Sequence, residues 1–156
     1  MVISPRVLCF IRSGNRVLLI HRRKAPHAGQ WDGIGGKLEP GEDPFTACVR
    51  EVQEETGLTI SKPQLRALSV ISVRSTDELW LLFTFSVEAP HEAVTASDEG
   101  DLAWVELDQV ALLPVVADLP ILLSHLDRQK VAIIRQEYET DDAASVIQTQ
   151  VFAQPD

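Results

Sequence analysis

Four glutamates gather in one short block of this chain, at a spacing that could hold a metal ion. Glu51, Glu54 and Glu55 lie three and four residues apart, so on a helix they would project from one stripe. Glu42 lies a short distance before them. Like charges at helical spacing repel one another by roughly 0.2–0.5 kcal/mol per pair. The block therefore predicts a positively charged partner.

The ligand chemistry of the block indicates which partner to expect. Carboxylates without a closely spaced pair of histidines or cysteines suit hard cations such as Mg²⁺ or Mn²⁺, whereas zinc would favour histidine or cysteine. In proteins, Mg²⁺ held by carboxylates commonly binds substrate phosphates and activates water for in-line attack on phosphorus. We therefore predict hydrolysis of a phosphoanhydride, with Mg²⁺ as the cofactor and Mn²⁺ as a substitute.

Local signals predict a helix over residues 44–56 that carries these acids. Asp43 is a good N-cap, Pro44 suits the first helical position, and Gly57 suits the left-handed residue that ends a helix. Apolar side chains recur on one face of the segment, which is its predicted core face: Phe45, Cys48, Val49 and Val52. Glycines before the helix would let a ligand approach the backbone: Gly35, Gly36 and Gly41.

The rest of the chain alternates short apolar runs with turn-rich segments. Residues 79–87 show the period of two that is typical of a strand. By the same reasoning the chain is predicted to form strands over residues 7–11, 17–21, 65–73, 79–87, 104–107, 131–138 and 146–152, and a second helix over residues 119–128. Two helices on opposite faces of mixed strands predict an α/β (α+β) fold, a three-layer α/β/α sandwich with a mixed central sheet.

Composition limits the classes of function and partner. A chain of 156 residues with 45% hydrophobic content suits one domain over residues 1–156, and its net charge of -9 disfavours a nucleic acid polymer as partner. No apolar run is long enough to cross a membrane. Cys9 and Cys48 lie in apolar surroundings and are predicted to be buried thiols, which favours a cytoplasmic location. The oligomeric state stays open.

From residue 36 to residue 58 the chain resembles the full signature of the Nudix hydrolases. The matching residues are Gly36, Glu42, Arg50, Glu51, Glu54, Glu55, Gly57 and Leu58. A solvated, glutamate-rich helix would explain neither the glycines nor the clustered acids. The resemblance implies the Nudix fold and three metal ligands, Glu51, Glu54 and Glu55, near the Gly36 carbonyl. It also implies structural roles for Glu42, Arg50 and Gly57.

A second stretch, residues 97–101, resembles the loop by which MutT-like Nudix enzymes send a further acid to the metal. The resemblance implies that Glu99 is a metal ligand or the general base. Glu51 competes with Glu99 for the role of base, and residue spacing does not separate the two. We therefore predict catalytic roles for Glu51, Glu54 and Glu99 and leave the identity of the base open.

Substrate contacts are predicted on the segments that precede the signature. Arg23 follows a strand and is predicted to meet phosphate oxygens. Lys37, in a Gly-Gly-Lys run that is typical of the MutT-like branch, is predicted to pair with a nearby loop acid and to border the substrate. Trp31 and Asp32 are candidates for a base pocket, whereas His27 is interpreted as a surface loop imidazole.

The resemblance to MutT-like enzymes also implies a substrate class. It favours hydrolysis of a nucleoside triphosphate to a monophosphate and pyrophosphate, with 8-oxo-dGTP or a related purine nucleotide as the leading substrate. Two departures bear on the base: Asp32 stands where the animal oxidised-purine enzymes carry Asn, and residues 113–118 show no counterpart of their paired aspartates. The alternatives are hydrolysis of nucleoside diphosphate derivatives (ADP-ribose, nucleotide sugars or dinucleoside polyphosphates) and a catalytically silent domain that binds nucleotides or proteins.

Overall fold

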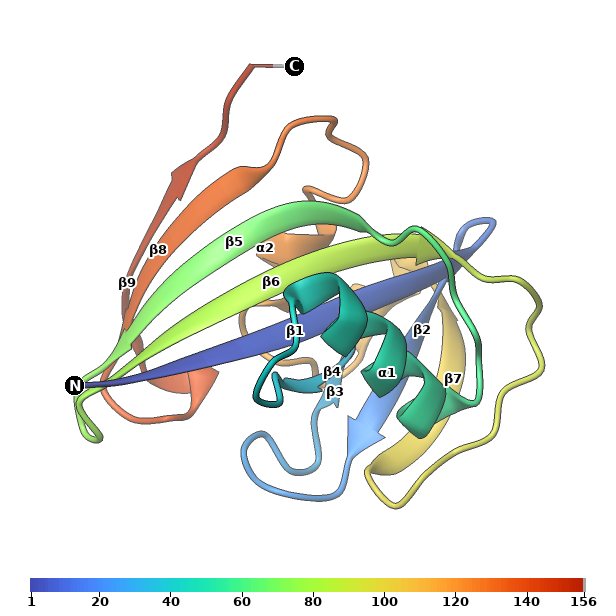
Figure 1. Cartoon of the computed structure of the whole chain (residues 1–156), viewed down its shortest axis with the longest axis horizontal. Coiled ribbons are helices and arrows are strands. Elements are labelled where there is room, and N and C mark those ends of the chain that lie inside the picture. Colours follow the sequence, from blue (N-terminus) through green and yellow to red (C-terminus); the bar gives the residue numbers. More distant parts are fainter. Residues whose placement is uncertain (156) are drawn as a thin grey trace.

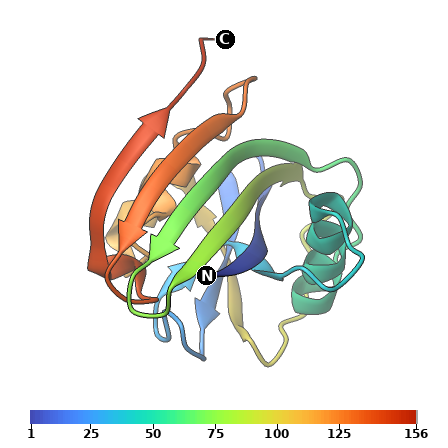
Figure 2. The same cartoon turned by 60° about the vertical axis from the view of Figure 1, so that its left-hand side comes forward.

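The sheet is the frame on which the candidate site is built. The structure is a computed structural model that describes residues 1–155, and within them nine strands form one mixed sheet (Figures 1 and 2). The strands are β1 (Val2–Ser13), β2 (Arg16–Arg22), β3 (Trp31–Asp32), β4 (Ile34–Lys37), β5 (Gln64–Val73), β6 (Glu78–Glu88), β7 (Gly100–Glu106), β8 (Ala132–Tyr138) and β9 (Val146–Phe152). The helices are α1 (Pro44–Thr56) and α2 (Leu119–Leu123), with 3-10 turns η1 (Leu107–Leu112) and η2 (Ala143–Ser145).

The strand order is β3-β2-β1-β6-β5-β8-β9, with β4 paired to β1 and β7 paired to β2. Strands β1 and β6 run parallel, as do β5 and β8, and the other pairs are antiparallel. β1 touches β2 only near their shared turn, where Arg12 faces Val17, while β4 lies beside the middle of β1. The two strands therefore diverge, and β4 enters between them with its glycines.

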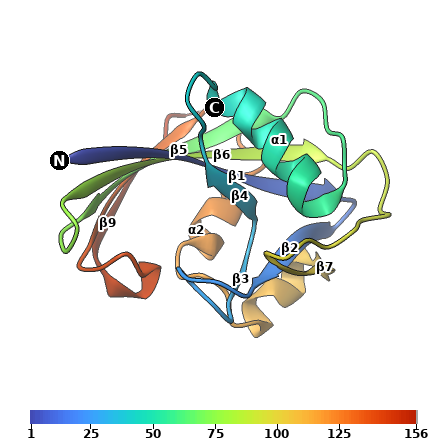
Figure 3. The same ribbon diagram turned by 60° about the horizontal axis from the view of Figure 1, so that its bottom comes forward.

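Helix α1 covers one face of the sheet and α2 covers the other, which gives three layers (Figure 3). Alternation along β1 explains why both faces are covered: Val7 and Cys9 pack on the α1 side, whereas Leu8 and Phe10 pack on the α2 side. A strand that is apolar on both faces is stable only when both are buried. The predicted fold class, with its mixed central sheet, is confirmed.

The ends of α1 form as the local signals predict. The side chain of Asp43 accepts a hydrogen bond from the Thr46 backbone N–H at 2.9 Å, and Pro44 occupies the first turn. Gly57 has φ 77° in the left-handed region, and its N–H bonds to the Gln53 carbonyl at 3.0 Å. Both ends of the helix that carries the acids are thus fixed by residues next to it in sequence.

The second helix is shorter than predicted. α2 ends at Leu123, not at residue 128, because the following backbone bonds span three residues: the His125 N–H bonds to the Leu122 carbonyl and the Leu126 N–H to the Leu123 carbonyl. β7 is longer than predicted, since it begins at Gly100. The short strands β3 and β4 lack an apolar run and were not predicted.

No helix within residues 1–155 combines the length and the apolar character needed to cross a membrane.

Candidate active site

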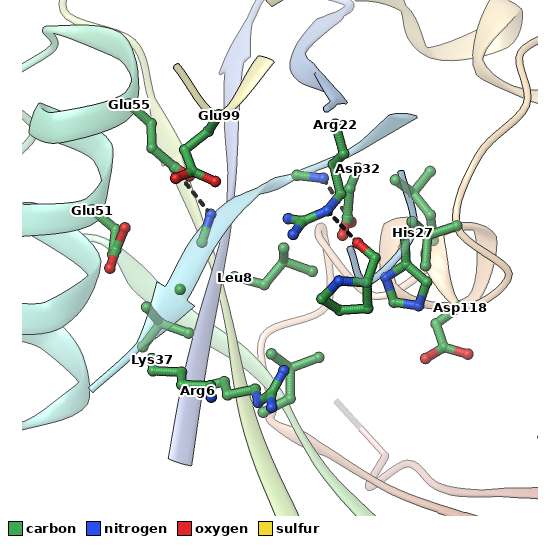
Figure 4. Close-up of a pocket in the computed structure, with 18 of the residues that line it drawn as sticks. Arg6, Leu8, Arg22, His27, Asp32, Lys37, Glu51, Glu55, Glu99 and Asp118 are labelled. Atoms are coloured by element: carbon green, nitrogen blue, oxygen red, sulfur yellow. Dashed lines mark hydrogen bonds between the residues drawn. The ribbon is translucent and has the colours of Figure 1, made fainter. Parts of the chain in front are cut away.

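A cavity of about 510 Å³ opens between α1 and the loop that precedes α2. Acidic side chains from α1 and from the loop before β7 line one end, as Figure 4 shows for Glu51, Glu55 and Glu99. The other end is lined by Asp32 and Asp118. Arg6 and Lys37 lie on the lower side of the same view. The cavity thus joins the predicted metal ligands to a second polar cluster.

Arg50 binds most of the acids of the signature at once. Its guanidinium contacts Glu42 twice, from Nε at 2.8 Å and from Nη2 at 2.9 Å, and Nη1 lies 2.9 Å from Glu51 and 3.2 Å from Glu54. It also donates to the Lys37 carbonyl at 3.1 Å. The hydrogen bond from Arg50 lowers the pKa of Glu42 below its usual value. This network joins the loop to α1, while the structural role of Arg50 and Glu42 stays a prediction.

Glu55 is the most deeply buried of the acids on α1. Its residue exposure is 5%, and Oε2 accepts a hydrogen bond from the Gly35 N–H at 3.0 Å. Burial, followed by repulsion from Glu51, raises the pKa of Glu55 to about 8. Burial also raises the pKa of Glu51. Glu55 therefore holds a proton at neutral pH unless a cation takes the place of that proton.

Two glycines of β4 permit this close approach for different reasons. A Cβ at Gly35 would lie 2.1 Å from the Val7 carbonyl oxygen, so the backbone of β1 excludes a side chain there. A Cβ at Gly36 would lie 2.4 Å from Glu51 Oε1. Gly36 therefore brings its backbone against the Glu51 carboxylate, as expected if the two share a ligand.

The donor set fits a divalent cation in chemistry, although its members are not yet gathered around one point. Within residues 1–155 no three acidic, histidine or cysteine side chains are placed as a complete metal site. Arg50 holds Glu51 and Glu54, and both are side chains that can turn. Repulsion from Glu51 and Glu99 contributes to the raised pKa of Glu55, which a dication would reverse. The predicted ligands Gly36, Glu51, Glu54, Glu55 and Glu99 all line the cavity.

Glu99 reaches this site from a loop distant in sequence. Its backbone carbonyl accepts a hydrogen bond from the Arg23 N–H at 3.0 Å, which places the loop beside the end of β2. Its carboxylate lies close to that of Glu55 (Figure 4) and 3.8 Å from Lys24 Nζ. The structure thus brings Glu99 to the α1 acids, while its part as ligand or base stays a prediction.

The far end of the cavity holds a buried carboxyl, Asp32. Burial raises the pKa of Asp32 to about 7, although its Oδ1 accepts a hydrogen bond from the Gly33 N–H at 2.8 Å. Near neutral pH, Asp32 is therefore populated as a carboxylic acid, which can donate a hydrogen bond as well as accept one. A hydrogen-bond donor is thus available at this end of the cavity even though residue 32 is an acid.

Asp118 faces the same end of the cavity, and sequence analysis assigned it no role. It accepts hydrogen bonds from Gln136 Nε2 at 2.9 Å and from the Tyr138 hydroxyl, and this contact together with burial raises the pKa of the Tyr138 phenol. Backbone bonds join Trp31 to residues 114 and 116 and so draw this loop to β3. A signal was present in the sequence, since Asp118 directly precedes the predicted helix.

His27 also differs from its interpretation as a surface imidazole. Its side chain is 11% exposed and lines the cavity, and Nε2 accepts a hydrogen bond from the Ala143 N–H at 3.0 Å. Burial lowers the pKa of His27, so its neutral form is favoured. His27 therefore joins the segment before β3 to η2 and closes this end of the cavity.

Two predicted substrate contacts lie outside the cavity. Arg23 is turned toward Asp101, to which Nη2 donates at 2.5 Å, whereas its neighbour Arg22 lines the cavity and donates from Nε to the Pro26 carbonyl at 2.8 Å. Trp31 stacks on His21, with ring centroids 4.7 Å apart. Lys37 does line the cavity, and no ion pair joins it to a loop acid within residues 1–155.

A mixed sheet between two helices, with a glutamate-rich helix and a glycine-rich strand at a cavity, agrees with the class of hydrolases to which the sequence signature points. The NUDIX domain profile matches residues 3–126, and the chain belongs to this family of hydrolases. The predicted family is confirmed.

Relatives and solved structures agree with this assignment. The chain is 32% identical over 111 residues to the uncharacterised Nudix hydrolase YvcI of Bacillus subtilis, covering 69% of this chain and 68% of that one. It is 32% identical over 122 residues to the oxidized purine nucleoside triphosphate hydrolase of Mus musculus, covering 74% and 77%. A MutT protein from Bacillus halodurans superposes with a TM-score of 0.81 at 28% identity, covering 97% and 99%.

Proposed function

We propose that this protein is a Mg²⁺-dependent pyrophosphohydrolase that cleaves a nucleoside triphosphate to a monophosphate and pyrophosphate, with an oxidised purine nucleotide such as 8-oxo-dGTP as the leading substrate. One observation carries the proposal: a single cavity joins the acids of α1 to a buried carboxyl pair, Asp32 and Asp118. Phosphates and a base are the two ends of a nucleotide, and each end of the cavity suits one of them.

At the acidic end, the metal would be held by Glu51, Glu54 and Glu55 with the Gly36 carbonyl and Glu99. Once bound, Mg²⁺ supplies charge neutralisation for the phosphates and a more acidic water. Glu51 and Glu99 are the two candidates for accepting the proton of that water. Arg50 keeps α1 and the loop in register, so that these carboxylates face the same space.

Positive charge for the phosphate chain comes from the sides of the cavity. Arg22 and Lys37 both line it, and a guanidinium can meet two phosphate oxygens at once. Arg22 takes the part that was predicted for Arg23, because Arg23 is held by Asp101. Arg6 lies near Lys37 but is stacked over Trp80, with 3.9 Å between Cζ and the ring centroid.

At the other end, Asp32 and Asp118 offer complementary hydrogen bonds to a purine. The protonated form of Asp32 would donate to a ring acceptor or carbonyl oxygen, while the Asp118 carboxylate would accept from a ring or exocyclic N–H. A site built to pair polar groups rejects ligands that leave those groups unpaired. Similarity to the oxidized purine nucleoside triphosphate hydrolase of Mus musculus supports a purine as the base of the substrate. The chain is also 29% identical to the CTP pyrophosphohydrolase of Escherichia coli, so a pyrimidine is included in the test below.

A nucleotide panel separates this proposal from its alternatives. Purified protein is incubated with 8-oxo-dGTP, dGTP, dATP, CTP and ADP-ribose, with and without Mg²⁺, and the release of pyrophosphate and of phosphate is measured. Pyrophosphate from triphosphates supports the proposal, whereas cleavage of ADP-ribose alone supports a diphosphate-derivative hydrolase. Nucleotide binding without turnover would indicate a silent domain. Neither binding nor turnover with Mg²⁺ or Mn²⁺ would refute all three.

A matched pair of variants locates the site. Glu54→Gln is expected to lower activity strongly with folding retained, since Glu54 is exposed on α1. Glu88→Gln removes the same charge from the exposed end of β6 and is expected to leave activity unchanged. Normal turnover in Glu54→Gln would refute the assignment of the acidic end. The buried thiols of Cys9 and Cys48 favour a reducing compartment such as the cytoplasm for this activity.

A further inference from the structure

The sheet ends in β9, a strand with an open edge. Within residues 1–155, β9 pairs only with β8, and Figure 2 shows it as the outermost strand. Every residue of β9 is exposed. In an antiparallel pair, alternate residues direct their N–H and C=O groups away from the partner strand, so the outer edge of β9 offers a row of backbone groups for further pairing.

Proteins usually protect such an edge with charge, proline or a bulge. The sequence of β9, VIQTQVF, has no charged residue, no proline and no glycine. Its pairing with β8 skips Ile147, so the strand has one irregularity near its start and is regular from Gln148 to Phe152. Its apolar side chains are well exposed: Ile147 at 49%, Val151 at 41% and Phe152 at 50%. Ile133 on β8, which faces Phe152, adds a further exposed side chain at 40%. The edge therefore has the composition of a strand that is covered.

The order of residues in β9 indicates what covers it. The strand is nearly the same read in either direction about Thr149: Gln148 matches Gln150, and Ile147 matches Val151. In a two-fold symmetric contact between two copies, residue i of the first copy meets residue j of the second, and residue j of the first meets residue i of the second. Two antiparallel β9 strands centred on Thr149 would therefore place Gln148 opposite Gln150 and Ile147 opposite Val151. The irregularity at Ile147 then lies toward each end of the contact and not at its centre.

Charge in the turn of the β8–β9 hairpin agrees with this register. Glu139, Asp141 and Asp142 lie in the turn near the start of β9. A two-fold axis through Thr149 brings the start of one β9 beside the end of the other. The two acidic turns then lie at opposite ends of the contact, which keeps their like charges apart.

We propose that β9 is a homodimer interface, in which two copies of this chain pair β9 against β9 in antiparallel fashion about a two-fold axis at Thr149. The contact joins the two sheets into one, pairs the outer backbone groups of β9 and places its exposed side chains next to those of the second β9. Because it is a narrow, edge-to-edge contact, the expected dissociation constant is on the order of 10 µM. The inference rests on the fold and is independent of the proposed function.

Charge exchange at residue 149 tests both the contact and its register. Sedimentation velocity over a concentration series is expected to show a reversible monomer–dimer equilibrium for the wild type. Thr149→Lys and Thr149→Glu each place like charges opposite one another on the axis, so each variant alone is expected to be monomeric. An equimolar mixture is expected to dimerise again, because the charges then have opposite signs.

The controls remove the simpler explanations. Both variants lose the bond from Gln136 Nε2 to Thr149 Oγ1 at 3.3 Å, so a general loss of folding would affect the mixture as well. Thr95→Lys and Thr95→Glu make the same charge changes at an exposed threonine near the end of α1 and are expected to dimerise like the wild type. A wild type that stays monomeric up to about 1 mM, or dimers that persist in Thr149→Lys, would overturn the interface. A mixture that stays monomeric would overturn the two-fold register.

Discussion

Replacing Gly36 by alanine tests whether the contact between β4 and Glu51 organises the site. The added Cβ would lie 2.4 Å from Glu51 Oε1 and 2.5 Å from its Cδ. Ordinary contact begins near 3.4 Å, so the carboxylate must move by about 1 Å. The atoms in the way belong to the end of a flexible side chain, so the backbone can stay where it is.

The expected result is a loss of activity without a loss of stability. A displacement of this size at a reacting group costs about 100-fold in rate, so kcat should fall by that order in Gly36→Ala. The free energy of unfolding should change by less than about 1 kcal/mol. Gly35→Ala is the matched comparison: its Cβ would meet the Val7 carbonyl at 2.1 Å, where backbone cannot give way. That variant should lose about 3 kcal/mol of stability.

The assay combines steady-state pyrophosphate release at saturating Mg²⁺ with urea unfolding of both variants. Gly36→Ala with full activity would refute the proposed position of Glu51. Gly36→Ala as unstable as Gly35→Ala would show that the contact supports the fold, not the site.

Three further predictions concern other parts of the site. Burial raises the pKa of Asp32 to about 7, above its unfolded value of 3.8, so this group stabilises the fold below pH 4 and loses that effect as the pH rises through 7. In urea titrations, the stability of the wild type relative to Asp32→Asn should therefore fall by up to about 4 kcal/mol between pH 4 and pH 8. Parallel stability curves for the two proteins would contradict the raised pKa. Arg50→Gln removes the guanidinium from between Glu42 and Glu51 and should lower the Tm by about 5 °C or more in thermal scans. Adding Mg²⁺ should restore part of the loss. An unchanged Tm would argue against a structural role for Arg50. Gly57→Ala forces a side chain into φ 77° and should cost about 1–2 kcal/mol in chemical unfolding, whereas a neutral result would mean that the end of α1 relaxes.

Much of the fold was open to prediction because its signals are local. The strands with apolar runs and the ends of α1 depend on neighbouring residues, and they form at or around the predicted segments, although β7 begins earlier and ends one residue sooner than predicted. β3 and β4 were missed because pairing creates them: β4 is rich in glycine and becomes a strand only beside β1. The predicted length of α2 failed for a related reason, since an apolar period extends past Leu123 while the backbone tightens there.

In the candidate site too, some residues could be predicted from local sequence and others only from the pairing of distant segments. Spacing within α1 placed Glu51, Glu54 and Glu55 on one stripe, and that relation holds in any helix. The choice between Arg22 and Arg23 required the register of β2, because Arg22 is its last residue and Arg23 directly follows it, and successive residues of an extended chain point to opposite faces. Arg22 continues the face of Leu18 and Ile20, which is turned toward α1.

The sequence by itself determined the family, the helix that bears the acids, and the type of cation they suit, because each follows from residues close together in the chain. The tertiary structure decided which distant groups join them. It brought Glu99 beside Glu55, set Asp118 near Asp32 and closed the cavity with His27. These meetings depend on strand pairing and on backbone bonds across loops, which no local pattern records.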